Sequence, residues 1–120
     1  MKIKFVSYLI LCAALAAHRV SAADFAFTRT STNDAPNEAL VTLEINFEGT
    51  GISHAVEESL PGALTVAGTP SSAGTVLADG RTLRWGPFDL VAGTTLTYRV
   101  TGVAGSHEIE GSVWMDGHAV

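Results

Sequence analysis

A strict alternation of apolar and polar residues is the feature that most limits what this chain can fold into. It is clearest in ALVTLEINFEG, residues 39–49, where every second residue from position 41 to 47 is apolar. Successive side chains of a β-strand point to opposite faces, so a period of two predicts a strand with one face in a core. The core residues predicted from this strand are Val41, Leu43, Ile45 and Phe47.

Similar short apolar runs, separated by turn-forming residues, recur at 24–31, 52–60, 63–70, 71–80, 81–86, 94–102 and 107–117. Asp79-Gly80 is a hairpin signal within this series, and no segment has a convincing helical period. About seven strands at a spacing of roughly 8–12 residues favour an all-β fold, an antiparallel two-sheet sandwich of the immunoglobulin-like or fibronectin-III-like kind. The later runs predict the further core residues Leu83, Trp85, Leu96, Tyr98 and Val100.

The first 22 residues are of another type. Lys2 and Lys4 precede an apolar run over residues 5–17, and the small residues Ser21 and Ala22 follow it. This order is typical of a secretory signal peptide cut after Ala22. The apolar run is also shorter than the roughly 20 residues that a membrane-spanning helix needs. We therefore expect a signal peptide at 1–22, one domain at 23–120, and an extracellular, cell-surface or periplasmic location.

Removal of the predicted signal peptide changes the composition. Three of the seven Lys and Arg residues and the single cysteine, Cys12, lie in it, so four basic residues face twelve acidic ones and the net charge is −8. A chain without a basic stripe is a poor candidate for nucleic-acid binding. Disulfides are impossible, so stability must come from the core. We expect no membrane span in the mature chain, and a protein or a polysaccharide at the cell surface as partner.

Catalytic and metal-binding patterns are weak. Ser106, His107 and Glu108 are neighbours on a predicted strand, so their side chains alternate between faces and cannot form a relay. We therefore expect neither an enzyme nor a cofactor. Calcium prefers oxygen ligands, and four acids could meet in a loop cluster, although a solvated acidic surface fits them better. These weak calcium candidates are Glu57, Glu58, Asp89 and Asp116.

Trp114 has two interpretations. If Val113 and Met115 point into the core, Trp114 points outward and marks a contact surface. If Gly111 forms a bulge, the register shifts and Trp114 is buried instead. Sugar-binding sandwiches stack sugar rings on exposed aromatic side chains, so Trp114 and Phe88 are the candidate ligand contacts.

Several turn and core motifs follow one another in an order that resembles a known family. They are Ser59-Leu60-Pro61-Gly62, Trp85-Gly86, Gly93-Thr94 with Leu96, Tyr98 and Val100, and Gly111 with Asp116-Gly117. Together they resemble bacterial immunoglobulin-like domains of the conserved-repeat type, over about residues 40–117. The resemblance implies a non-catalytic secreted or cell-surface module with a structural or adhesive role. Two alternatives stay open: a carbohydrate-binding module that uses Trp114, and a fragment or accessory domain of a larger surface protein.

Overall fold

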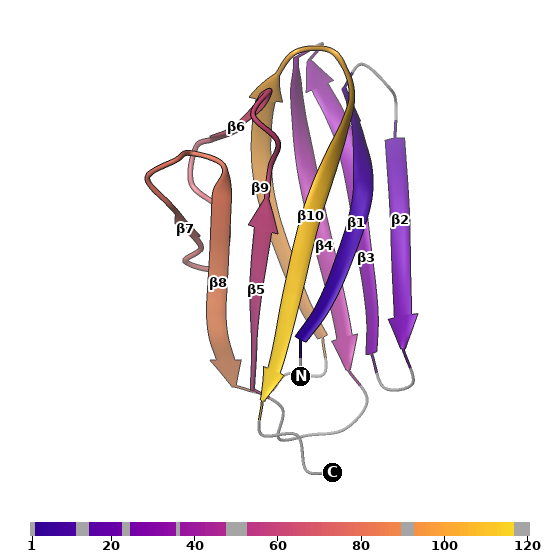
Figure 1. Cartoon of the computed structure of the whole chain (residues 1–120), viewed down its shortest axis with the longest axis vertical. Helices are drawn as coiled ribbons and strands as arrows, with labels where there is room; N and C mark the ends of the chain where they lie inside the picture. The colour runs from indigo at the N-terminus through magenta and orange to yellow at the C-terminus, as the bar shows by residue number, and fades with distance from the viewer. Residues whose placement is uncertain are drawn as a thin grey trace.

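The computed structural model describes residues 2–11, 15–22, 25–35, 37–47, 53–89 and 93–116. These residues form ten β-strands in two antiparallel five-stranded sheets, which pack face to face (Figure 1). The prediction of an all-β two-sheet sandwich is confirmed. In the described part of the chain, no helix is long and apolar enough to cross a membrane.

The first sheet has the order β1-β10-β5-β8-β7 and the second β2-β3-β4-β9-β6. The strands of the first sheet are β1 (Lys2–Leu11), β10 (Gly105–Asp116), β5 (Ser53–Ser59), β8 (Thr82–Asp89) and β7 (Thr75–Val76). Those of the second are β2 (Leu15–Ala22), β3 (Phe25–Ala35), β4 (Glu38–Phe47), β9 (Gly93–Gly102) and β6 (Leu64–Ala67). Eight of the ten strands follow the apolar runs expected from the sequence.

The other two strands, β1 and β2, come from the predicted signal peptide and form the outer edge of each sheet. Strand β1 pairs with β10 from Lys2 opposite Trp114 to Leu11 opposite Gly105, and β2 pairs with β3. An open sheet edge readily accepts an apolar extended segment, because its N–H and C=O groups are unpaired. Cleavage after Ala22 stays a prediction; it would leave four strands in each sheet, with β10 and β3 at the edges.

The core fills the space between the sheets. Trp85 of the first sheet and Tyr98 of the second meet across it, with ring centroids 5.8 Å apart. The Trp85 Nε1–H donates a hydrogen bond to the Ser71 carbonyl at 2.8 Å, so its one polar atom is satisfied. All the predicted core residues whose side chains are described are buried: Val41, Leu43, Ile45, Leu83, Trp85, Leu96, Tyr98 and Val100. The side chain of Phe47 lies outside the described residues.

A pair of oppositely charged side chains, Arg29 and Glu58, is buried in this core. Arg29 on β3 donates from Nε to Oε1 of Glu58 at 3.0 Å and from Nη2 to Oε2 at 2.5 Å, so the two sheets are joined by a bidentate ion pair. Glu58 therefore does not belong to the acidic surface expected from the sequence. It lies two residues after the buried Val56 and shares its inward face.

Burial raises the pKa of Glu58 from 4.5 to about 7, because desolvation outweighs the opposing attraction of Arg29. The Tyr98 hydroxyl lies beside the same carboxylate, without the geometry of a formed hydrogen bond. Desolvation, followed by the Glu58 charge, raises the pKa of Tyr98 well above 10. Because Glu58 is the buried acid among the described residues and its pKa is raised, its protonation state affects the stability of the fold.

Candidate functional site

Trp114 lies on the outer face of the first sheet. Strand β10 pairs with β1 and with β5 without a shift in register, which places Trp114 opposite Lys2 and Ala55. The neighbouring Val113 is fully buried, whereas 36% of the Trp114 surface is exposed. The alternation therefore continues through Gly111, and the bulge that would bury Trp114 is not formed.

A bulge does occur on β8, at Gly86-Pro87. His54 pairs with Phe88 and Val56 pairs with Trp85, so two residues of β8 face the single residue Ala55. Gly86 has a φ of 95°, a conformation that residues with a Cβ rarely adopt.

The apolar run predicted at 81–86 would end the strand at Gly86-Pro87, but β8 continues to Asp89. The physical reason is that the bulge accommodates Pro87, which has no N–H to donate to the sheet. The bulge also sets glycine opposite alanine on the outer face, where neither residue has a large side chain.

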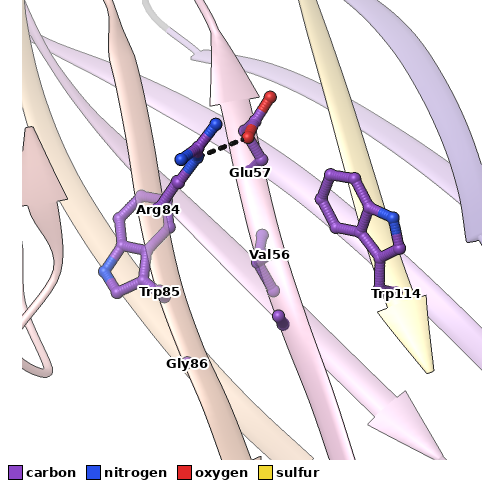
Figure 2. Close-up of a pocket in the computed structure, with 7 residues that line it drawn as sticks. Val56, Glu57, Arg84, Trp85, Gly86 and Trp114 are labelled. Atoms are coloured by element: carbon purple, nitrogen blue, oxygen red, sulfur yellow. Dashed lines mark hydrogen bonds and ion pairs between the residues drawn. The ribbon is translucent and has the colours of Figure 1, made fainter. Parts of the chain in front are cut away.

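An open hollow of about 290 Å³ results on this face (Figure 2). Trp114 on β10 lies on one side of it, and Arg84 on β8 with Glu57 on β5 lies on the other. Its remaining lining residues are Ala55, Val56, Trp85 and Gly86. Small-molecule pockets usually measure about 300–1,000 Å³, so this hollow suits one ring-sized group.

Arg84 and Glu57 form an ion pair across the two strands. They are partners in the β5–β8 register, and the Arg84 Nε–H donates to Glu57 Oε2 at 2.7 Å. The two side chains are 60% and 25% exposed. An exposed pair contributes only about 0–1 kcal/mol to stability. Ser112 is opposite Glu57 and Thr75 opposite Arg84, so a polar row crosses the sheet beside Trp114.

The four calcium candidates are not brought together. Glu57 points outward and Glu58 inward, where it is paired with Arg29. The backbones of Asp89 and Asp116 both pair with Ser53, but their side chains lie outside the described residues. Glu57 lies four residues along β5 from Ser53, a distance of about 13 Å, so its backbone is far from those of Asp89 and Asp116. Among the described residues, no group of three or more His, Cys, Asp or Glu side chains is placed to hold a metal ion.

Phe88, the other candidate ligand contact, has its backbone in β8, and its side chain is outside the described residues. The sequence missed the placement of Arg84 and Glu57 beside Trp114. Its alternation does put Arg84 on the face opposite Trp85. Nothing in a period of two, however, indicates which acid on another strand the arginine meets.

Comparison with known proteins gives no match to a protein-family model or to a curated protein. Among solved structures, the chain is similar to the chitin-binding domain of a hyperthermophilic chitinase from Pyrococcus furiosus. Its solution structure has a TM-score of 0.59 and 17% identity, covering 84% of this chain and 96% of that chain. A crystal structure of the chitin-binding domain of chitinase from the same organism has a TM-score of 0.54 and 18% identity, covering 96% and 99%.

At this identity the similarity shows the fold alone. It supports a β-sandwich domain, and the more specific resemblance to bacterial immunoglobulin-like repeats stays a prediction. The chain is thus a two-sheet β-sandwich with the same fold as these domains and an exposed tryptophan beside a hollow on one outer face.

Proposed function

We propose that this chain is a non-catalytic carbohydrate-binding module that stacks a sugar ring on Trp114. The observation that carries the proposal is the exposed indole of Trp114 at the side of a small open hollow on a sheet face. The fold shared with two structures of chitin-binding domains adds support. Chitin or another structural polysaccharide is therefore the first ligand to test.

The physical basis is the apolar face of a sugar ring, whose C–H groups can cover an aromatic ring. A tryptophan side chain buries up to about 250 Å² in a core, so with β1 in place the 36% exposure corresponds to at most about 90 Å². Covering that area contributes about 2 kcal/mol, which is close to a 30-fold change in affinity. A single stacked ring is a weak site by itself, so neighbouring polar contacts have to add to it.

A pull-down with insoluble chitin and cellulose tests the proposal. The Trp114→Ala variant should lose about 30-fold in affinity for the polysaccharide that the wild type binds. Val103→Ala is the matched control, because Val103 is an exposed apolar residue on another part of the surface, 67% exposed. Its affinity should equal that of the wild type. Absence of wild-type binding to every polysaccharide, or equal loss in both variants, would refute the proposal.

The structural or adhesive role implied by the family resemblance is the weaker candidate, because no described surface feature selects a protein partner. A role as accessory domain of a larger surface protein is compatible with carbohydrate binding, since such a module can attach its neighbours to a polysaccharide. The predicted signal peptide accords with a ligand outside the cell, and secretion is part of this proposal.

A further inference from the structure

We propose that the Arg84–Glu57 ion pair recognises the polar edge of the sugar that stacks on Trp114, and that the ligand class is an uncharged polysaccharide. This inference rests on the proposed function, and it adds the residues that select the ligand. It is carried by three observations on the outer face of the first sheet: the position of the pair, its unused hydrogen-bonding groups, and the charge around it.

The position of the pair is set by the sheet. Arg84 and Glu57 lie across the hollow from Trp114 (Figure 2). Ala55 and Gly86 also line the hollow, and their small size leaves the space between the pair and Trp114 unfilled. A sugar ring that stacks on an indole directs its equatorial hydroxyl groups sideways from the ring edge. A ring held against Trp114 in this hollow would therefore present hydroxyl groups to the pair.

The hydrogen-bonding capacity of the pair is only partly used. Arg84 has five N–H donors and uses the one on Nε, and Glu57 accepts that bond with Oε2. Within the described residues, the four N–H groups of the Arg84 Nη atoms and the Glu57 Oε1 atom have no other hydrogen-bond partner. Neighbouring sugar hydroxyls each donate and accept, so one can accept from Arg84 while the next donates to Glu57.

The charge around the pair disfavours anionic sugars. Glu57 balances the charge of Arg84 at 2.7 Å. Farther along β10, the two acids Glu108 and Glu110 are exposed on the same outer face. On the neighbouring strand β1, the exposed base Lys4 lies opposite Ser112. The net charge is −5 for the whole chain and −8 without the predicted signal peptide. A uronic-acid or sulfated polymer would be repelled, because like charges brought together at an interface cost binding free energy.

Binding of the full chain to chitin and cellulose, compared with binding to soluble polygalacturonate, tests the inference. Arg84→Gln and Glu57→Gln should each weaken the binding to the uncharged polymer about tenfold or more, because each removes a charge-assisted hydrogen bond. Arg84→Lys keeps the charge but loses the planar set of donors, and should also bind several-fold more weakly. The matched control is Arg99→Gln, which breaks the exposed Arg99–Glu38 pair on the other sheet and should bind within about twofold of the wild type.

The outcomes separate the two proposals. If the wild type binds and Trp114→Ala does not, while all three variants of the pair bind like the wild type, this inference is overturned and the proposed function stands. If the wild type binds no polysaccharide, the proposed function itself fails. The ligand class is wrong if polygalacturonate binds more tightly than chitin and cellulose. A tenfold loss of affinity between about 0.05 M and about 0.5 M NaCl would also contradict an uncharged ligand, because salt screens attraction between charges.

Discussion

Raising the pH from about 5 to about 8 should destabilise this protein through the buried acid Glu58. Burial raises the pKa of Glu58 from 4.5 to about 7, and Arg29 opposes that rise without cancelling it. An acid whose pKa is higher in the folded state holds its proton more tightly there than in the unfolded chain. Its contribution to stability is therefore complete below pH 4.5 and is lost as the pH rises through about 7.

The size of the effect follows from the same values. A tenfold change in proton affinity corresponds to about 1.4 kcal/mol, so the rise in the Glu58 pKa costs on the order of 3 kcal/mol at high pH. Small domains have a total stability of about 5–15 kcal/mol, so this is a large share. With a urea dependence of about 1.5 kcal/mol per molar, the unfolding midpoint should fall by about 2 M.

Urea unfolding followed by tryptophan fluorescence at pH 5 and pH 8 measures this effect. The wild type and the control Glu57→Gln should both show the fall in midpoint. Glu58→Gln has no group to titrate at this position and should show a much smaller fall. The difference between the midpoint shifts of Glu58→Gln and the wild type isolates the contribution of Glu58. A wild-type midpoint that rises toward pH 8 would refute the reasoning, because attraction to Arg29 would then outweigh desolvation.

Two further predictions concern the bulge and the N-terminus. Gly86→Ala should lower the free energy of unfolding by about 1–2 kcal/mol, because alanine is strained at a φ of 95°. Gly62→Ala, where no atom lies within 4 Å of the added Cβ, should change it by less than about 0.5 kcal/mol, and equal urea midpoints for the two variants would contradict this assignment. N-terminal sequencing of the protein exported from bacterial cells should begin at Ala23, and an intact N-terminus on the exported protein would exclude the predicted cleavage.

Local periodicity accounts for the correct part of the fold prediction. In residues 39–49 the alternation identifies an inward face because the side chains of a strand alternate whatever the strand pairs with. The same rule puts Trp85 in the core, but it left Trp114 open between an outward and a buried position. It could not decide between a continuous β10 and a bulge at Gly111, because both satisfy the local pattern and only the pairing with β5 and β1 distinguishes them.

The strand break expected at Gly86-Pro87 has a similar explanation. Glycine and proline usually interrupt a strand, and the sequence alone does not show that a neighbouring strand can accept an extra residue. Here β5 remains paired on both sides of the two residues, so the backbone forms a bulge instead of a turn. The hollow beside Trp114 depends on this bulge, and it was not predictable.

The sequence by itself thus determined the all-β class, the approximate positions of most strands, and the inward faces of the strands that form the core. Tertiary structure decided which arginine each of the two neighbouring acids on β5 meets. Glu57 meets Arg84 from 27 residues away, and Glu58 meets Arg29 from 29 residues away, on opposite faces of one strand. Periodicity is a local property of the chain, whereas these partners depend on how the strands pair and how one sheet packs on the other.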